Sequence, residues 1–428
     1  MNKRVAITTL GCKSNQCDSF FIQEQIKRNG MEIVDSPSEA DVCIINTCTV
    51  TARSDYQCRQ AIRRIIRENS SAEVYITGCY AVTGREEIQG IPGVTKVIPP
   101  EDIDNFLDGV VRRKNSKMIS GNNGFHFVED FIGRTRAFFK IQDGCNFRCS
   151  FCIVPFARGK SRSLPVNDVL HGFKRYAQLG YKEVVLTGVH LGSYGADLYP
   201  SFRLDDLLAE IAEKISGIRI RISSLDPNEI SDRTIRLVSE TDLFCRHFHI
   251  PLQSGDKEVL RNMNRGYTPE KFSEVVMAIK KRIPDAGIGI DVIAGFPGEG
   301  EKEFRNTCSL IHDLPITYLH AFPFSLRKGT RAWAMNGNLT RNVIKDRVRS
   351  LISIGKAKRM EFFNFLIGRE LDVIVEGENI KGMWRGFSSS YVPVLIENCA
   401  DLENRLVRVR IERASDSSLV AGEVLNYV

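Results

Sequence analysis

The central part of the chain repeats one pattern, a short apolar strand followed by an amphipathic helix, about every 35 residues. Alternating strands and helices predict a parallel sheet covered by its helices. Six such units indicate an open or partial barrel and not a closed barrel of eight units. The candidate strands are Ala137–Ile141, Glu183–Leu186, Ile218–Ile222, Arg246–Ile250, Gly287–Ile293 and Tyr318–Pro323. The predicted helices are Val166–Leu179, Asp205–Ile215, Asn228–Ser239, Pro269–Arg282 and Glu301–Asp313.

A cysteine triplet follows the first of these strands. Cys145, Cys149 and Cys152 have the spacing Cys-x₃-Cys-x₂-Cys, at the carboxyl end of a strand, where ligands of such barrels collect. Three thiolates can hold three irons of a [4Fe–4S] cluster, whose full complement is four cysteines, and leave one iron open to a small molecule. The alternative is structural zinc, but its ligands usually come in two pairs, and the sequence has no matching second pair.

The triplet resembles that of the radical S-adenosylmethionine (SAM) superfamily. In that superfamily the amino and carboxylate groups of SAM bind the open iron, and the reduced cluster splits SAM into methionine and a 5′-deoxyadenosyl radical. The resemblance therefore implies radical chemistry, which cofactors supply and side chains do not.

Residues 1–115 form a second strand–helix block, for which we predict a doubly wound parallel sheet. The polar stretch Ser116–Gly124 is typical of a domain linker. The predicted strands are Val5–Thr9, Val42–Asn46, Val74–Thr77 and Val94–Ile98, and the predicted helices are Ser19–Asn29 and Asp55–Glu68.

Three cysteines of this block come just after predicted strands: Cys12, Cys48 and Cys79. Because the carboxyl ends of parallel strands lie along one edge, these thiols are expected to meet in space and to bind a second cluster with an open iron. Gly11 and Gly78 would let the backbone approach a bulky cofactor.

The other cysteines of this block lack that position. Cys43 falls within a strand and is expected to be a packed core thiol, and Cys58 lies within a helix. Cys17 lies five residues after Cys12, and its role stays open.

The remaining chain predicts a basic helix and a small β module. The helix spans residues 341–366 and completes a central domain of residues 131–365; the module occupies residues 366–428. Five short strands predict an OB-like barrel, which often binds RNA, although a structural cap is the alternative. The predicted strands are Leu371–Glu376, Lys381–Phe387, Tyr391–Ile396, Arg405–Arg413 and Ser418–Leu425.

Composition is that of a globular enzyme, with 43% hydrophobic and 26% charged residues in 428. No apolar run has the length of a signal peptide core or a membrane span. Twelve cysteines without a secretion signal indicate reduced thiols, and hence a cytoplasmic protein. The net charge of +7 permits a polyanionic partner but does not demonstrate one.

Over nearly its whole length, the chain resembles the radical-SAM methylthiotransferase family. Thr9–Asn15, Asn46–Cys48 and Gly78–Cys79 match the N-terminal domain and its auxiliary cluster ligands, and Lys140–Pro155, His249–Gly255, Met263–Thr268 and Asp291–Glu299 match the radical-SAM core. The terminal module resembles the TRAM domain through Gly386–Val394, where Ser390 replaces an Asn found in many members. That segment implies RNA contacts by Ser388 and Tyr391.

The segment Phe156–Ser163 resembles the branch that acts on N6-threonylcarbamoyladenosine (t6A) at tRNA position 37. The isopentenyladenosine branch usually carries a glutamate-containing sequence there, and the ribosomal-protein branch usually replaces the Ser-Gly of His249–Gly255. A non-catalytic RNA-binding protein with structural clusters is a further alternative. A P-loop is excluded, because Val154 stands where that motif needs glycine.

The resemblance implies the chemistry. The radical would remove hydrogen from adenine carbon 2, and the auxiliary cluster would hold or deliver a sulfur that a second SAM methylates. Each turnover would use two [4Fe–4S] clusters and two SAM molecules. The implied partners are a tRNA anticodon loop, a low-potential donor of the flavodoxin or ferredoxin type, and a sulfur donor, without a membrane.

Polar residues at strand ends are candidates for SAM contacts, with turn capping as the alternative. These are Thr187, Gly188, Ser223, Ser224, Gln253, Asp291 and Ile293. His249 is expected to be a hydrogen-bonded structural histidine. Arg158, Lys160 and Arg162 are candidates for RNA phosphates or the threonyl carboxylate, or else form a solvated charge run. On the basic helix, phosphate contacts are predicted for Arg347, Lys356, Lys358 and Arg359.

Overall fold

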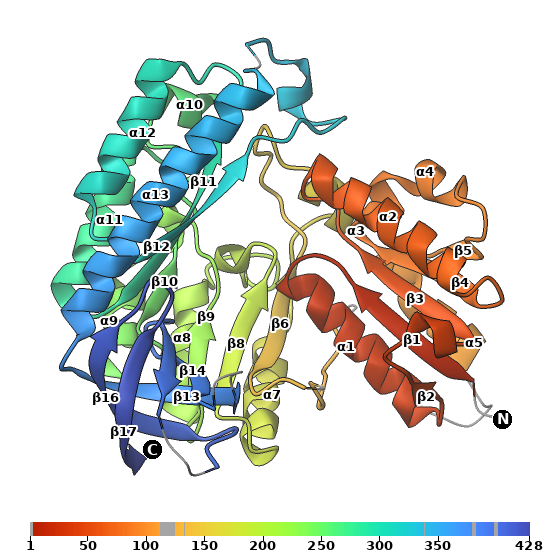
Figure 1. The fold of residues 1–428 in the computed structure, drawn as a ribbon, viewed down its shortest axis with the longest axis horizontal. Coiled ribbons are helices and arrows are strands. Elements are labelled where there is room, and N and C mark those ends of the chain that lie inside the picture. The colour runs from red at the N-terminus through yellow and green to blue at the C-terminus, as the bar shows by residue number, and fades with distance from the viewer. Residues whose placement is uncertain (1–2, 112–124, 132, 338, 379–381, 398–400) are drawn as a thin grey trace.

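The protein is described by a computed structural model that covers residues 3–111, 125–131, 133–337, 339–378, 382–397 and 401–428. An N-terminal α/β part lies beside a central partial barrel, and a small β-barrel lies below that partial barrel in the view of Figure 1. The predicted linker Ser116–Gly124 lies outside the described residues, and so does Lys381, the predicted start of one strand.

The N-terminal sheet has five parallel strands in the order β2-β1-β3-β4-β5. This is the flavodoxin-like doubly wound order, in which ligands bind where the strand order reverses, between β1 and β3. The strands are β1 Arg4–Thr9, β2 Glu32–Ile33, β3 Val42–Thr47, β4 Glu73–Gly78 and β5 Lys96–Val97. The helices are α1 Lys13–Arg28, α2 Ala52–Glu68, α3 Cys79–Thr83, α4 Arg85–Gln89 and α5 Ile103–Val111.

Helix α1 joins the N-terminal sheet to the central part. Phe20 and Phe21 belong to one continuous apolar core that also contains Phe131 and Phe138, and the rings of Phe20 and Phe131 are 5.1 Å apart. The helix begins six residues before the predicted Ser19, because its first turns bury polar side chains that an apolar pattern does not reveal. The N-terminal part and the central part therefore share one hydrophobic core where they meet.

The central part has six parallel strands, as predicted, divided between two sheets. The Ile220 N–H donates to the Leu243 carbonyl, and the Cys245 N–H donates to the Ile220 carbonyl. These backbone hydrogen bonds connect the two sheets, so the six strands form a partial barrel. The strands are β6 Ala137–Asp143, β8 Glu183–Gly188, β9 Arg219–Ile222, β10 His247–His249, β11 Gly287–Ala294 and β12 Tyr318–Pro323, with the short antiparallel β7 Arg162–Ser163 beside β6. The helices are α6 Val154–Arg158, α7 Val166–Gln178, α8 Leu204–Lys214, α9 Asp232–Glu240, α10 Lys257–Asn262, α11 Pro269–Arg282 and α12 Glu301–Asp313.

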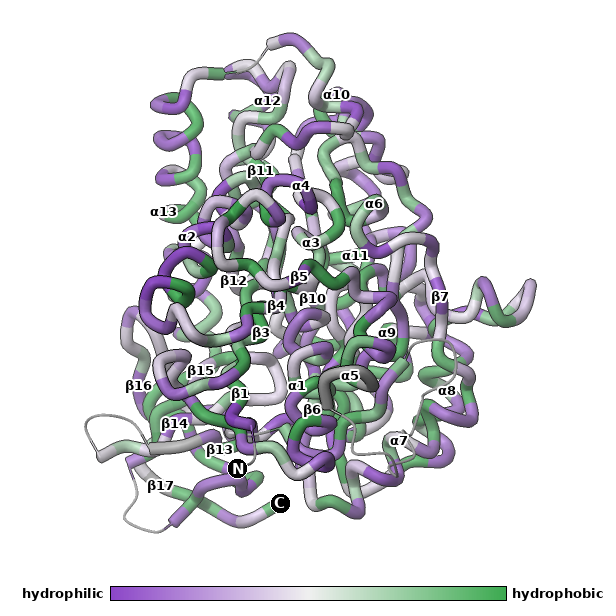
Figure 2. Tube along the Cα trace, turned by 90° about the vertical axis from the view of Figure 1, so that its right-hand side faces the viewer, coloured by the Kyte–Doolittle hydropathy of each residue, from purple (hydrophilic) through white to green (hydrophobic). Residues whose placement is uncertain are grey.

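The long helix α13, Arg341–Leu366, covers β12 and leads into the C-terminal module. Hydrophilic and hydrophobic residues alternate along it (Figure 2), and Leu351, Gly355 and Phe362 are on its buried side. The module is a closed barrel in the order β13-β14-β15-β17-β16. Its strands are β13 Glu370–Glu378, β14 Trp384–Ser388, β15 Pro393–Ile396, β16 Leu406–Ala414 and β17 Leu419–Tyr427.

The module docks on the amino ends of the central strands. Arg219 donates to the carbonyl oxygens of Asp372 (3.0 Å) and Phe387 (2.9 Å), and Arg221 donates to those of Ser388 (3.0 Å) and Ser389 (2.8 Å). The opposite, carboxyl ends of these strands remain available for a site.

The predicted fold class is confirmed in its three parts. Among the described residues, no helix combines the length and apolar character required to cross a membrane.

Candidate functional site

The triplet loop is held open by backbone contacts from two directions. Gly144 has φ +71°, and a Cβ there would lie 2.0 Å from the Lys160 carbonyl oxygen, so only glycine fits. Cys145 N–H donates to the Gly159 carbonyl (3.1 Å), and Ser150 N–H donates to that of Met263 (2.9 Å). The loop is therefore shaped by the protein before any cofactor binds.

The three thiols of the triplet line one cavity of about 200 Å³ at the carboxyl ends of the central strands. Aromatic and polar groups complete its wall, among them Phe147, Phe151, Ser224 and Gln253. Three cysteines converging on one concave space fit a [4Fe–4S] cluster, with room beside it for a ligand on the open iron.

Two cations contact this thiol set, and the sequence interpretation assigned neither. Arg265 Nη1 lies 3.2 Å from Cys149 Sγ, and the same guanidinium pairs with Asp226. Burial lowers the pKa of His190, but hydrogen bonds to Cys145 and Glu229 outweigh it and raise the pKa to about 9, which makes the ring a cation at neutral pH. Positive charge beside the thiols favours their ionised, metal-binding form.

Some residues expected to contact SAM lie at this cavity or its neighbour. Ser224 and Gln253 line the triplet cavity, and Gln253, Asp291 and Ile293 line the next one. Gln253 adopts a left-handed φ of 61°, which turns its backbone at the end of the fourth strand. These four residues remain candidates for ligand contacts.

The other three expected SAM contacts make hydrogen bonds or close packing contacts within the protein. Thr187 Oγ1 donates to the Val185 carbonyl (3.0 Å), and Ser223 N–H donates to that of Leu186 (3.2 Å). Gly188 leaves space for Gln142, since a Cβ there would lie 2.9 Å from the Gln142 amide oxygen. Thr187 thus fits polar pairing within the barrel wall, whereas the buried Ser223 hydroxyl has no hydrogen-bond partner among the described residues.

The N-terminal cysteines converge at the carboxyl edge of their sheet. Cys12 Sγ and Cys79 Sγ lie 3.9 Å and 3.8 Å from the same atom, Asn15 Oδ1. A Cβ at Gly11 would lie 2.9 Å from Cys48 Cβ and one at Gly78 would overlap the Asn46 side chain, so both glycines are needed for the approach. Three thiols at one rim, with glycine between them and the sheet, fit a second cluster.

The remaining cysteines of this part have other roles. The Cys17 thiol is 3.6 Å from the Phe138 carbonyl, to which it donates, and burial raises its pKa to about 12, so it is a neutral core thiol. Cys58 exchanges hydrogen bonds with the backbone of Cys48 at 3.3 and 3.4 Å and thereby supports the loop. Cys43 is buried, as predicted.

A second cavity, of about 220 Å³, is lined by residues that are close in the chain to cysteines of both sets. Val50 and Thr51, just after Cys48, form one side, and Phe151, between Cys149 and Cys152, forms another. A planar group bound here would contact the segment that follows Cys48 and the residue that lies between Cys149 and Cys152.

His249 is hydrogen-bonded, as expected of a structural histidine. Its Nδ1 is 2.8 Å from Ser224 Oγ and its Nε2 is 3.3 Å from Asp291 Oδ1. The exposed His320 stands next to this pair. His249, Asp291 and His320 therefore form a polar cluster, of which Asp291 lines the second cavity.

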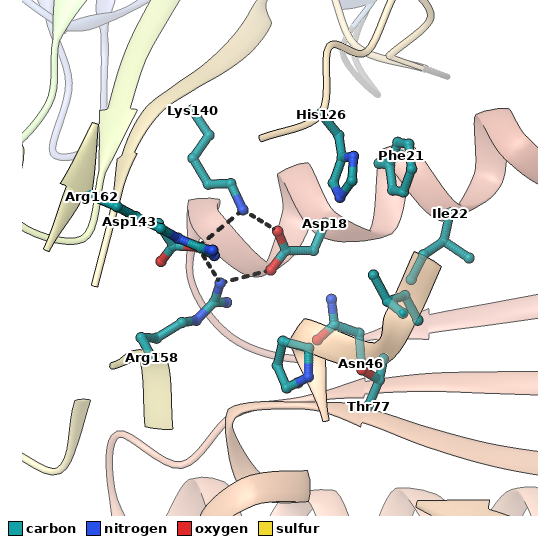
Figure 3. A pocket seen from close by; sticks show the side chains of 13 residues that line it. Asp18, Phe21, Ile22, Asn46, Thr77, His126, Lys140, Asp143, Arg158 and Arg162 are labelled. Atoms are coloured by element: carbon teal, nitrogen blue, oxygen red, sulfur yellow. Dashed lines mark hydrogen bonds and ion pairs between the residues drawn. The ribbon is translucent and has the colours of Figure 1, made fainter. Parts of the chain in front are cut away.

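Arg158 is neither solvated nor free for RNA, contrary to both sequence interpretations. Its side chain is 4% exposed and contacts Asp18 and Asp143, as Figure 3 shows. Lys160 is exposed, and Arg162 is 43% exposed with an ion pair to Asp143. Only the last two have the accessibility that a phosphate contact requires.

The predicted RNA contacts of the module lie at its joint with the partial barrel. Ser388 is fully buried, and the ring of Tyr391 is 4.9 Å from the Arg221 guanidinium and 4.9 Å from the His247 ring. Ser390 is also buried, with its carbonyl close to Gly287. In this structure the segment is an internal contact and not an RNA-facing surface.

The basic helix is similarly divided. Arg347 is buried, 2.6 Å from Glu299, and Lys358 is buried, 3.1 Å from Glu361. Lys356 is exposed and Arg359 is half-buried. The last two retain access to a phosphate.

The comparisons with known proteins cover both cysteine sets. Residues 139–311 match the family described as the radical SAM superfamily, and residues 4–98 match an uncharacterized protein family, UPF0004. The chain is 38% identical to the threonylcarbamoyladenosine tRNA methylthiotransferase MtaB of Bacillus subtilis, over 96% of this chain and 94% of that protein. It is 31% identical to the tRNA-2-methylthio-N6-dimethylallyladenosine synthase of Syntrophus aciditrophicus, over 99% and 95%.

A solved structure supports the fold alone. The radical SAM methyltransferase TsrM from Kitasatospora setae superposes with a TM-score of 0.53 at 16% identity, over 75% of this chain and 73% of that one. With the identities and coverage above, the chain belongs to the radical-SAM methylthiotransferase family.

Proposed function

We propose that this protein methylthiolates carbon 2 of t6A at position 37 of tRNA. The observation that carries the proposal is one cavity lined both by Val50 and Thr51, which follow Cys48, and by Phe151, which lies between Cys149 and Cys152. The t6A substrate rests on the resemblance of Phe156–Ser163 and on the 38% identity to a protein named for it, against 31% for one named for dimethylallyladenosine.

The residues divide the work between two sites. Cys145, Cys149 and Cys152 would hold the radical-SAM cluster, and Cys12, Cys48 and Cys79 the auxiliary cluster. When bound, the clusters and SAM supply a radical and a soft sulfur that no side chain provides. Ser224, Gln253, Asp291 and Ile293 are proposed ligand contacts.

The protein's own groups orient and shield these ligands. Arg265 and the His190 cation compensate thiolate charge, so that adding an electron costs less. Phe151 and Phe322 offer flat apolar surfaces against which a purine can stack. A base must leave its stack to enter, as in other enzymes that modify a base.

The proposed partners and location follow from this reaction, and the proposed domain boundaries follow from the sequence pattern. We propose domains of residues 1–115, 131–365 and 366–428, the last TRAM-like, and a cytoplasmic location with the tRNA. A flavodoxin- or ferredoxin-type donor would deliver electrons, and a separate donor would deliver sulfur. Lys160, Arg162, Lys356 and Arg359 are the proposed phosphate contacts.

The test combines nucleoside analysis with two cysteine variants. The reconstituted enzyme, SAM, dithionite and tRNA from a strain without the modification should yield the 2-methylthio derivative of t6A, detected by mass spectrometry. Cys152→Ala should abolish 5′-deoxyadenosine formation, whereas Cys79→Ala should retain it and lose the methylthio product. Cys308→Ala, outside both sets, is the matched control and should behave as wild type.

The outcomes separate the alternatives. Methylthiolation of isopentenyladenosine instead of t6A would assign the enzyme to the other tRNA branch. An altered ribosomal protein with unchanged nucleosides would replace tRNA as the substrate. Absence of 5′-deoxyadenosine from fully loaded wild type would leave a non-catalytic cluster protein.

A further inference from the structure

Arg158 belongs to the central part of the protein but reaches across the joint to the N-terminal thiol set. It ends α6, and Gly159, with φ +71°, turns the chain away directly after it. Its Nε lies 3.2 Å from Cys79 Sγ, and its Nη2 lies 2.6 Å from Asn15 Oδ1. Asn15 is also the residue that Cys12 and Cys79 both approach.

The rest of the guanidinium is fixed by carboxylates from both sides of the joint. Nη1 lies 2.9 Å from Asp18 on α1 and 3.4 Å from Asp143 at the end of β6 (Figure 3). Asp143 is two residues before Cys145, and its carboxylate also accepts from the Gly144 N–H (2.8 Å). One side chain thus connects an N-terminal thiol to the strand end that carries the triplet.

The charged groups around Arg158 are compatible with a hydrogen bond from its guanidinium to a thiolate. Lys140 contacts both carboxylates, at 2.5 Å from Asp18 and 3.3 Å from Asp143, and Arg162 contacts Asp143 at 3.3 Å. Asp18 and Asp143 are therefore shared between Arg158 and Lys140, and the Nε of Arg158 is the atom that faces the Cys79 sulfur, at 3.2 Å. An ionised Cys79 would accept a charge-assisted hydrogen bond from this Nε–H.

We propose that Arg158 is a positioning residue that donates a charge-assisted hydrogen bond to the Cys79 ligand of the auxiliary cluster and holds that cluster in register with the radical-SAM triplet. The inference rests on the proposed function, because it takes Cys79 as a cluster ligand. It assigns the conspicuous Arg158 of the segment Phe156–Ser163 to the cluster and not to tRNA.

Two consequences follow from a donor at a cluster thiolate. Hydrogen bonds to cluster sulfurs help to set the reduction potential, and a cation favours the more negative, reduced form. Loss of Arg158 should therefore lower the potential of the auxiliary cluster. It should also loosen the joint, so that radicals form but are less often used for sulfur insertion.

The first measurement isolates the auxiliary cluster. In full-length protein in which Cys145, Cys149 and Cys152 are alanine, only that cluster remains, with about four irons per chain. Arg158→Met should reduce its one-electron reduction constant about tenfold, a fall of about 59 mV. Arg175→Gln is the matched control for the potential, because it also removes an arginine from an ion pair of the central part, here the pair with Glu129 at 2.7 Å.

The second measurement uses the otherwise native enzyme with SAM, dithionite and tRNA. Arg158→Met should retain 5′-deoxyadenosine formation and give about tenfold less methylthio product per 5′-deoxyadenosine. Arg158→Lys keeps the charge but not the four-way geometry, so the potential should recover more than the product ratio. If Arg158→Met fails to bind about four irons, Arg158→Gln, which also removes the charge, gives the same comparison.

An unchanged potential in Arg158→Met or Arg158→Gln would overturn the inference, and so would an unchanged product ratio. The potential is measured without tRNA, so it does not depend on which substrate the enzyme uses. Failure of the wild type to modify t6A would instead contradict the proposed function and leave the potential result standing.

Discussion

Removal of the Glu183 carboxylate should destabilise the joint beneath the partial barrel. Glu183 is fully buried at the start of β8 and lies 2.5 Å from Arg219, 2.8 Å from Arg221 and 3.6 Å from Arg136. Burial by itself would raise the pKa of Glu183, but Arg219 and Arg221 outweigh it and hold the pKa well below its usual range.

The magnitude follows from what Glu183→Ala leaves behind. Removing one partner of a buried ion pair typically costs about 3–5 kcal/mol, because the other charge stays buried without compensation. Here Arg219 and Arg221 would be left, and they also hold the C-terminal module through its carbonyls. We therefore expect the free energy of unfolding to fall by about 3–5 kcal/mol.

The assay is urea unfolding followed by circular dichroism at pH 7. Glu210→Ala is the matched control, because Glu210 forms an exposed pair with Lys214 on α8, and such a pair contributes about 0.3–0.5 kcal/mol. The loaded Glu183→Ala enzyme should still cleave SAM, since the joint is at the opposite end of the strands.

The effect should also depend on pH with a defined sign. The folded pKa of Glu183 is lower than its unfolded pKa of about 4.3, so its stabilisation is complete above that value and is lost as the pH falls through the folded pKa. The difference between wild type and Glu183→Ala should therefore shrink between pH 5 and pH 3. A difference below about 1 kcal/mol at pH 7, or one that stays constant on acidification, would refute the reasoning.

Three further perturbations test other parts of the structure. Burial lowers the pKa of His126 to about 4, although Asp104 lies 3.4 Å away. Between pH 7 and pH 4 the free energy of unfolding of the wild type should therefore fall by up to about 3 kcal/mol more than that of His126→Phe, as measured by urea unfolding at each pH. Equal losses in the two proteins would argue against this reasoning. Gly287→Ala places a Cβ 1.9 Å from the Ser390 carbonyl oxygen and should cost about 1–3 kcal/mol in thermal unfolding, unlike Gly90→Ala, whose Cβ would lie at an ordinary contact distance of 3.5 Å from the Glu86 carbonyl oxygen. Arg265→Met should slow 5′-deoxyadenosine formation about 10- to 100-fold, and a wild-type rate would remove Arg265 from the site.

The parts of the fold that the sequence predicted well are those with a one-dimensional signal. Buried apolar runs located β1, β3 and β4, and the spacing of strands and helices indicated the partial barrel. The edge strand β5 is shorter than the predicted Val94–Ile98, since an edge strand pairs on one side only. The start of α1 was missed because Ser14 and Asn15, although polar, are buried against the sheet.

The site was predictable only where chain position determines it. Cys12, Cys48 and Cys79 follow parallel strands, so topology alone brings them to one rim. Arg158 gave no such signal, because its burial depends on how two domains dock. Arg265 lies in the motif Met263–Thr268, and its place between Cys149 and Asp226 appears only in three dimensions.

The joint beneath the partial barrel has an evolutionary consequence. Arg219 and Arg221 donate hydrogen bonds to main-chain carbonyl oxygens of the module. Every amino acid has such a carbonyl, whatever its side chain. A change at Ser390, which stands where many members have Asn, therefore leaves these four hydrogen bonds, and with them the orientation of the module, in place. In homologues, the orientation of the C-terminal module relative to the partial barrel should be better preserved than the amino-acid sequence at the joint.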